Sequence, residues 1–369
     1  MSTHQRMTRV YEHKEPDRVP ITDWVWESTT ARWRTEGMPE NVSPEERFGW
    51  DSIVTIGADV TPRFEPRVIE ETKTYCVERD ALGQTHKNFK PVSATPQYID
   101  SGVKDRDTWR EAKRRMTPAR DRVNWQHLKA NYKRWRREGA WIRALALWGF
   151  DVVSTRMCNS EIILYAMAED PEWVKDMCDT GCDLALALFD AVWREGYTFD
   201  ELFWCDDMAY RNGLLFSKQM WREIAMPYQK RYLDWAHAHG IKVHLHCCGK
   251  VNDLIPDLID LGLDALHPLE VKAGVDPIAV KKQYGDRLAL QGGFDIRNWS
   301  DPAESDAEIR RALPVLMESG GYVFSSDHSI ADNVGLKDYE RIVALVKEIG
   351  RYSYRKSEKP GARRESQRT

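Results

Sequence analysis

The sequence predicts an α/β protein built on a (β/α)8 barrel. From about Trp141 onward, short apolar stretches alternate with longer amphipathic ones, which is typical of parallel strands connected by helices. Helix-capping residues precede the amphipathic stretches and glycines follow them, so the unit repeats along the chain. The length of 369 residues also suits one barrel with insertions.

Seven segments have the length and apolar character of barrel strands. The first lies near the N-terminus, at residues 19–24. The others follow in order: 142–146, 201–205, 242–247, 265–268, 287–291 and 321–325. Together they account for most of the eight strands of a TIM-type barrel.

The helices between these strands have recognisable ends. Ser217 and Asn252 occupy expected N-cap positions, and aspartates at positions 170, 276 and 301 are each followed by a proline, which favours the first helical position. Glycines at positions 240, 262, 320 and 350 are expected to end helices.

Two insertions and a tail are expected around the barrel. Residues 50–100 should form a small N-terminal antiparallel β meander, because 68–71, 74–79 and 84–89 alternate apolar and polar residues between short turns. The charged stretch 104–139 should form one or two extra surface helices. We therefore expect a single domain over 1–355 and a disordered tail over 356–369.

Composition excludes several classes of protein. Lys and Arg total 54 against 58 Asp and Glu, a net charge of -4 that offers no basic surface to a nucleic acid. No run of 18 apolar residues occurs, and the first 19 residues lack the apolar segment of a secretory leader. Seven cysteines spread along the chain are expected to be reduced thiols, some of them metal ligands. We expect a cytoplasmic protein without nucleic-acid or membrane partners.

The most informative segment lies at the end of the strand expected at 242–247. Two histidines and two cysteines fall within five positions, 244 to 248, and these are the side chains that zinc prefers. Because alternate residues of a strand share a face, His246 and Cys248 are predicted to bind one metal ion while Cys247 points into the wall. A catalytic zinc site needs about three protein ligands, and Glu270 and His328, at later strand ends, are the expected remaining donors.

Other reactive residues also follow predicted strands, and the carboxyl ends of barrel strands meet at one mouth. Asp206 and Asp207 suit substrate binding or tuning of a pKa there, although both also suit capping of the segment that follows. Asp327 precedes His328, which fits either a metal ligand or a proton donor. His267 is explained more simply as a hydrogen-bonded structural residue.

Fifteen tryptophans serve mainly for packing, but three of them follow or end predicted strands. We expect Trp24, Trp148 and Trp204 to line a substrate pocket, because an aromatic wall suits an aromatic ligand.

The chain resembles the uroporphyrinogen decarboxylase superfamily over almost its whole length, from residues 13–20 to about Tyr352. The resemblance is strongest at 213–217 (Gly-Leu-Leu-Phe-Ser), 246–249 (His-Cys-Cys-Gly), 292–295 (Gly-Gly-Phe-Asp) and 326–330 (Ser-Asp-His-Ser-Ile). It implies a (β/α)8 barrel and one of two chemistries, since the superfamily contains metal-free decarboxylases and zinc-dependent, corrinoid-linked methyltransferases.

The motifs favour the methyltransferase branch. That branch carries a His-x-Cys pair followed by glycine, a further glutamate and a distant cysteine. His246 and Cys248 match the pair and Glu270 suits the acidic ligand, but His328 stands where the last cysteine is expected. The decarboxylases bind a polycarboxylate through an arginine-rich motif after the first strand, and residues 24–30 lack it.

The resemblance implies O-demethylation: methyl transfer from a small methylated compound to cobalamin on a partner protein. Tryptophans at strand ends favour a methoxylated aromatic donor. The alternative direction is methyl transfer from cobalamin to a thiol. Asp207 and Asp327 are expected to hydrogen-bond the substrate or to hold a ligand histidine in its tautomer. No Asp-x-His-x-x-Gly cobalamin motif occurs, so we expect a separate corrinoid-binding protein as partner, and allow for a homodimer.

Two alternatives of other classes remain. The first is a metal-free decarboxylase of a small carboxylated substrate, in which Asp206 or Asp207 stabilises a protonated intermediate and His328 donates a proton. The second is a binding barrel without catalysis.

Overall fold

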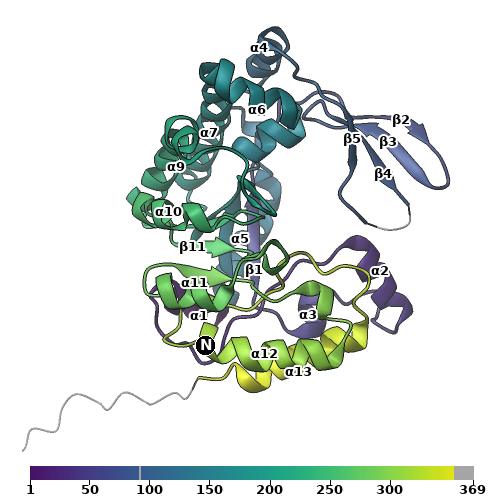
Figure 1. The fold of residues 1–369 in the computed structure, drawn as a ribbon, viewed down its shortest axis with the longest axis vertical. Helices are drawn as coiled ribbons and strands as arrows, with labels where there is room; N and C mark the ends of the chain where they lie inside the picture. The colour runs from purple at the N-terminus through teal and green to yellow at the C-terminus, as the bar shows by residue number, and fades with distance from the viewer. Residues whose placement is uncertain (91–92, 353–369) are drawn as a thin grey trace, which may run out of the picture.

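A curled parallel sheet forms the centre of the molecule (Figure 1). The computed structural model describes residues 1–90 and 93–352, so the tail expected at 356–369 lies outside the described residues. The strands of this sheet, in spatial order, are β1 (Ile53–Gly57), β6 (Trp141–Leu145), β7 (Glu201–Cys205), β10 (Lys242–His246), β11 (Ala265–His267), β12 (Ala289–Gln291) and β13 (Tyr322–Val323). All six neighbouring pairs are parallel, as the βα repeat predicts.

The segment expected as the first strand closes the sheet into a barrel. Ile21 forms a parallel bridge with Phe324, directly after β13. On its other side the Ile21 carbonyl accepts a 2.8 Å hydrogen bond from the amide of Asp51, just before β1. Residues 20–22 therefore occupy the eighth position between β13 and β1, although they form a single bridge in place of a full strand.

One barrel strand was not expected from the sequence. β1 lies inside the stretch 50–100 that was assigned to the meander, yet it pairs with β6. Its alternation of exposed and buried residues resembles a meander strand, because Ile53 and Thr55 line a cavity. The meander itself is confirmed as an antiparallel sheet of β2 (Arg67–Glu71), β3 (Tyr75–Arg79), β4 (Thr85–Phe89) and β5 (Gln97–Asp100), which stands out to one side of the molecule (Figure 1).

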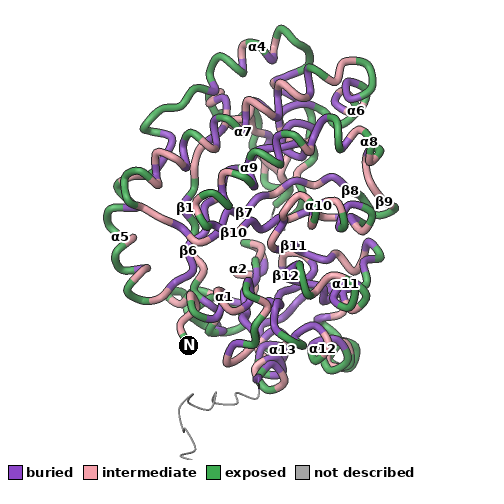
Figure 2. The backbone as a smooth tube through the Cα atoms, turned by 90° about the vertical axis from the view of Figure 1, so that its left-hand side faces the viewer, coloured by how far each residue is buried: buried purple, intermediate pink, exposed green. Residues whose placement is uncertain are grey.

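Helices surround the sheet, with buried sides toward it and exposed sides outward (Figure 2). They are α1 (Thr3–Tyr11), α2 (Glu27–Thr35), α3 (Pro44–Phe48), α4 (Arg106–Arg115), α5 (Trp125–Glu138), α6 (Ser160–Glu169), α7 (Pro171–Arg194), α8 (Lys218–Met220), α9 (Met226–Ala238), α10 (Ile255–Leu261), α11 (Pro277–Tyr284), α12 (Pro302–Leu316) and α13 (Leu336–Ile349). Within residues 1–90 and 93–352, no helix has both the length and the apolar character of a membrane span.

Several predicted helix ends are confirmed. The side chains of Ser217, Asp276 and Asp301 accept hydrogen bonds from backbone amides at the starts of α8, α11 and α12. Gly262 ends α10 in the left-handed conformation, with φ of 108°. Asn252 begins a short 3-10 turn before α10, so its predicted N-cap position is one turn early.

Helix α1 closes the amino-terminal end of the barrel. Met7, Val10 and Tyr11 belong to a separate buried cluster. The same cluster contains Trp141, Ala265 and Ala289, which are the first residues of β6, β11 and β12. The opposite end, where the strands finish, is thereby left as the open mouth.

Shortening a buried side chain of α1 that packs against the starts of the strands should lower the stability of the protein. Val10 is 1% exposed, so Val10→Ala should reduce the free energy of unfolding by about 2 kcal/mol through lost burial and an unfilled cavity. Val68 on β2 is 59% exposed, and Val68→Ala serves as the matched control with an effect within about 0.5 kcal/mol. Urea unfolding followed by circular dichroism measures both, and equal effects would contradict the role of α1.

Candidate metal centre and active site

A cavity of about 1000 Å³ lies at the mouth of the barrel. Strand ends form its floor and back, including Phe203, Cys205 and His246. The meander forms another wall through Leu82, Gln84, Tyr98 and neighbouring residues. The insertion therefore encloses space in front of the carboxyl ends of the strands, where barrel proteins place their chemistry.

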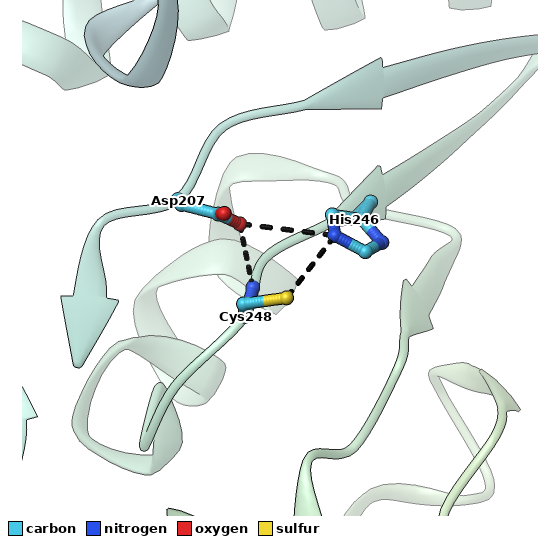
Figure 3. A group of neighbouring side chains, drawn as sticks. All are labelled: Asp207, His246 and Cys248. Carbon is cyan, nitrogen blue, oxygen red and sulfur yellow. Dashed lines mark hydrogen bonds and ion pairs between the residues drawn. The ribbon is translucent and has the colours of Figure 1, made fainter. Parts of the chain in front are cut away.

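Three side chains at this mouth form a cluster of metal-ligand type (Figure 3). One ligand atom each of Asp207, His246 and Cys248 lies within 4.8 Å of the other two. The Cys248 Sγ atom is 3.3 Å from His246 Nε2, and an Asp207 carboxylate oxygen is 3.8 Å from the same nitrogen. Among the described residues no other group of three such side chains comes this close.

The alternation of strand β10 brings two of these ligands together, as predicted. His244, His246 and Cys248 point into the barrel, whereas Cys247 is 1% exposed and contacts the backbone amide of Met208 at 3.4 Å. The chain then turns at Gly249, which has φ of 84° and leaves no room for a side chain, because a Cβ atom there would lie 2.5 Å from the Ala209 carbonyl carbon.

Asp207 joins the cluster from the neighbouring strand. It follows β7, and its carboxylate accepts a 2.7 Å hydrogen bond from the backbone amide of Cys248. Phe203, Cys205 and Asp207 are alternate residues that all line the cavity. The sequence predicted Asp207 as a catalytic residue, and the structure places one of its oxygens within 4.8 Å of the candidate ligand atoms of His246 and Cys248.

A second histidine orients the first. His246 Nδ1 lies 2.6 Å from His267 Nδ1, so one of these nitrogens carries a hydrogen and donates a hydrogen bond to the other. Burial, and then the nearby His328 ring, lower the pKa of His246 to about 4. Burial and the His246 ring also hold the pKa of His267 well below its usual range. Both rings are therefore neutral near pH 7, and a His246 that donates from Nδ1 presents a free Nε2 lone pair to the cluster.

The thiol and the carboxylate of the cluster are destabilised as anions in the absence of a cation. Burial, followed by the charge of Asp207, raises the pKa of Cys248 well above its usual range. Burial also raises the pKa of Asp207. A divalent cation between them would reverse both effects. The spacings of 3.3 and 3.8 Å suit ligands arranged around tetrahedral zinc, which are about 3.4–3.6 Å apart for bonds of about 2.0–2.3 Å.

The two other predicted ligands lie outside this cluster. The Glu270 carboxylate accepts a hydrogen bond from the amide of Gly249 and pairs with Lys272 at 3.3 Å. Glu270 was expected to be a direct ligand, but in the structure it supports the turn after Cys248. His328 lines the cavity and stacks on Trp26, with ring centroids 6.4 Å apart. Burial, followed by the charge of Lys272, lowers the pKa of His328.

Several predicted site residues face away from the cavity, which corrects their assignment to the substrate. Trp204 and Asp206 alternate with the inward residues of β7 and therefore point to the surrounding helices. Asp206 is fully buried and accepts a 2.8 Å hydrogen bond from the Tyr228 hydroxyl on α9. Trp204 stacks on Trp148 with centroids 5.7 Å apart, and both are buried.

Asp327 is also buried outside the cavity lining. Its carboxylate accepts a 3.1 Å hydrogen bond from the amide of Ile296 and a 3.4 Å bond from the amide of Lys272. It joins the loops that follow β11, β12 and β13, so it positions backbone at the mouth and does not face a substrate.

Trp24 does line the cavity, as predicted, and the lining residues that were not predicted include Arg143, Asp151, Trp26 and Phe203. The register of β6 offered a signal for Arg143, since a lone arginine within the apolar run Trp-Ile-Arg-Ala-Leu is unusual for a buried strand. Asp151 follows β6 at the start of a π-helical turn, Val152–Met157, which no sequence pattern distinguished.

Comparison with known proteins identifies related sequences and a related fold. A profile of the family described as "Uroporphyrinogen decarboxylase (URO-D)" matches residues 152–349. A uroporphyrinogen decarboxylase of Chlorobium limicola is 28% identical over 137 residues, which cover 36% of this chain and 38% of that protein. The "Methylcobamide:CoM methyltransferase MtaA" of Methanosarcina barkeri is 34% identical over 100 residues, 27% of this chain and 29% of that protein. The matched stretch thus spans less than two-fifths of either curated relative.

A solved structure supports the barrel. A "methyltransferase from Methanosarcina mazei" superimposes with a TM-score of 0.62 at 16% identity, and the match covers 94% of this chain and 99% of that chain. At this identity the likeness concerns the fold.

A carboxyl group in the cavity wall should make stability depend on pH. Burial raises the pKa of Asp23 to about 7, although its hydrogen bonds from Ser326 act in the opposite direction. The folded protein then holds a proton that the unfolded chain, with a pKa of about 3.9, has lost. Wild-type stability should fall between about pH 4 and pH 7 for this reason, and Asp23→Asn should remove that loss.

The comparison of the two proteins isolates this group. Urea unfolding at pH 5, 6, 7 and 8 should show the stability of Asp23→Asn improving relative to wild type as pH rises. A difference between the two proteins that stays constant across the range would contradict the raised pKa.

Proposed function

Because the chain belongs to the uroporphyrinogen decarboxylase (URO-D) family, and relatives of this chain include a methyltransferase as well as decarboxylases, we propose that it is a zinc-dependent methyltransferase. It moves a methyl group from a small methoxylated aromatic compound to cobalamin on a separate corrinoid protein. The observation that carries this proposal is the cluster of Asp207, His246 and Cys248 at the cavity.

The cluster suits a catalytic site because its three donors leave a fourth position toward the cavity. His246 Nε2, Cys248 Sγ and an Asp207 oxygen would hold a zinc ion, while His267 fixes the ring of His246 and Glu270 fixes the turn at Gly249. A zinc ion bound here supplies a Lewis acid beside the ether oxygen, which lowers the barrier to breaking the O–CH3 bond by several kcal/mol.

Other side chains of the cavity handle the ring and the leaving group. Trp24, Trp26 and Phe203 offer aromatic surfaces to the substrate ring. A reduced corrinoid on the partner would supply the acceptor for the methyl group, and the phenolate left in this cavity would need a proton. His328 stands at the cavity beside Trp26, and because its pKa is lowered the neutral ring is proposed to pass this proton from solvent to the oxygen.

A role for a methylated corrinoid is supported by one relative in particular. The name of the Methanosarcina barkeri protein describes a methyltransferase acting between a methylated cobamide and CoM. The reverse direction, from methylcobalamin to a thiol, uses the same cluster, and the aromatic walls of this cavity favour the aromatic donor.

The competing candidate is a metal-free decarboxylase, which the relatives of that name favour. Such an enzyme for a polycarboxylate would need several cations around its substrate. Among the described residues the cavity lining includes two arginines, Arg143 and Arg156, and no lysine. The scarcity of cations favours a substrate with fewer charges.

Replacement of the thiol ligand should remove the metal. Cys248→Ala should lose bound zinc and methyl transfer while the barrel stays folded, because the side chain lies at the mouth and not in the packed core. The matched control is Cys247→Ala, which removes the neighbouring thiol that points into the wall and should retain zinc. Elemental analysis with circular dichroism measures both, and stoichiometric zinc in Cys248→Ala would refute the ligand assignment.

A second pair of variants separates a ligand from its support. Asp207→Asn should weaken zinc binding more than Glu270→Gln, since the first removes a direct charged donor and the second a hydrogen bond to the turn. Loss of such a supporting contact costs about 10- to 100-fold in affinity. Competition with a fluorescent chelator gives both affinities, and a larger loss in Glu270→Gln would reverse the two roles.

The reaction itself should be visible in the absorbance of the corrinoid. Mixing the zinc-loaded protein with a reduced corrinoid protein and methoxylated aromatics should produce methylcobalamin. Methylamines and methylated thiols complete the panel. Absence of conversion with every compound, or undiminished turnover of a carboxylated substrate in the presence of chelator, would favour the decarboxylase.

A further inference from the structure

Arg143 is a buried cation at the inner end of the cavity. It lies on β6 between the buried residues Ile142 and Ala144, points into the barrel, and lines the cavity although it is only 4% exposed. A guanidinium group retains its charge in a protein interior, and placing it there is costly unless anions and hydrogen-bond acceptors surround it.

The acceptors around Arg143 are incomplete. The nearest charge is the Glu201 carboxylate, 3.7 Å from Nε, which is beyond hydrogen-bond distance. Arg143 Nε is buried without a hydrogen-bond partner, and within residues 1–90 and 93–352 the side chain donates no hydrogen bond to protein. Glu201 therefore balances the charge of Arg143, but the N–H groups of the Arg143 guanidinium remain free to bind a ligand.

Glu201 does not turn toward Arg143 because other groups hold it. Its carboxylate accepts hydrogen bonds from the Tyr11 hydroxyl at 2.8 Å and from Trp141 Nε1 at 2.7 Å, and lies 3.3 Å from His244 Nδ1. Burial alone would raise its pKa, yet the charge of Arg143 and the His244 ring lower the pKa of Glu201 to about 2. Glu201 thus keeps its charge and fixes the arginine from behind.

The surroundings of Arg143 suit an aromatic ligand. The guanidinium carbon lies over the ring of Phe203 at 4.7 Å and over the ring of Trp24 at 5.5 Å. Trp24 also contacts His267, which touches the metal-ligand candidate His246. Free donors and aromatic faces therefore line the same cavity as the metal-ligand cluster.

Acidic residues of the cavity wall do not occupy these donors. Asp51 pairs with Arg6 and with Arg18. Asp151 lies 3.5 Å from Arg156, in the segment that follows β6. Arg143 and Arg156 both line the cavity with an Nε that has no hydrogen-bond partner, but the Arg156 side chain is 42% exposed, whereas Arg143 is buried beside the rings of Phe203 and Trp24.

We propose that Arg143 binds a carboxylate of the substrate, so that the methyl donors are methoxylated aromatic acids. A guanidinium presents two parallel N–H donors that match a carboxylate, and such charge-assisted bonds are stronger than neutral ones. The inference rests on the proposed function for the methoxy group, but the carboxylate subsite is a property of the cavity alone. Arg143 is therefore a specificity-determining residue of the proposed reaction.

Binding of matched acids and amides tests the subsite without any corrinoid. Isothermal titration of the zinc-loaded protein with 2-, 3- and 4-methoxybenzoate should give at least one acid that binds about tenfold or more tightly than its methoxybenzamide. The amide keeps the ring and the shape but lacks the charge. Equal binding of every pair, or no binding of any acid, would overturn the proposal.

Variants assign the preference to Arg143. Arg143→Met alone leaves Glu201 as an unpaired buried charge, so the double variant Arg143→Met/Glu201→Gln, which removes both charges, protects the test against misfolding. The double variant should bind acid and amide equally. The exposed arginine variant Arg222→Gln should retain the wild-type preference. A preference that survives in a folded double variant would overturn the assignment.

Two further results separate this proposal from others. Inorganic phosphate that competes as strongly as benzoate would overturn the assignment to an aromatic carboxylate. A carboxylate preference that depends on Arg143 supports the subsite even if no methylcobalamin forms, in which case the methyl-transfer proposal alone fails. Methyl transfer from neutral and acidic donors at equal efficiency would leave the function intact and overturn the subsite.

Discussion

The alternation of side chains along strand β10, together with its register against its neighbours, determines the functional end of this protein. In β10 every second residue points into the barrel, so His244, His246 and Cys248 form one inward column. The register pairs His246 with Cys205 on β7 and with His267 on β11. The His267 ring and the residues after β7 therefore lie level with His246 along the barrel axis. A slip of one residue would turn Cys247 inward and point the two proposed ligands, His246 and Cys248, into the wall. Closure by residues 20–22 and the plug of α1 keep this arrangement inside a rigid cylinder open at one end.

Burial then decides the chemistry of these groups. Removal from water keeps His246 and His267 neutral and the Cys248 thiol protonated. Binding of a divalent cation would therefore displace the proton of the Cys248 thiol. Deeper in the barrel the same low dielectric makes the pair of Arg143 and Glu201 expensive. Tyr11 and Trp141 offset part of that cost by hydrogen-bonding Glu201. The helix that closes the bottom of the barrel is thereby connected to the bottom of the cavity, since Tyr11 belongs to α1.

Sequence reasoning reached the barrel because periodicity and capping residues are local signals. It located six strands from Trp141 onward, the meander, and the pairing of His246 with Cys248, all of which depend on spacing within one segment. It missed β1, whose inner face meets a cavity, so its pattern resembles that of a surface strand. It also expected Trp204 and Asp206 in the pocket, although their positions on β7 have the opposite parity to Phe203, Cys205 and Asp207. The choice of Asp207 over Glu270 depends on the distance between two strand ends, which no single segment of sequence encodes.

The central claim is that one imidazole, one thiolate and one carboxylate hold a divalent ion at the mouth of the barrel. X-ray absorption at the zinc edge of the purified protein measures this directly. The account predicts a four-coordinate ion with a single sulfur at about 2.3 Å and lighter ligands at about 2.0–2.2 Å. A shell with two or more sulfur atoms, or protein that binds no zinc under saturating conditions, would contradict it.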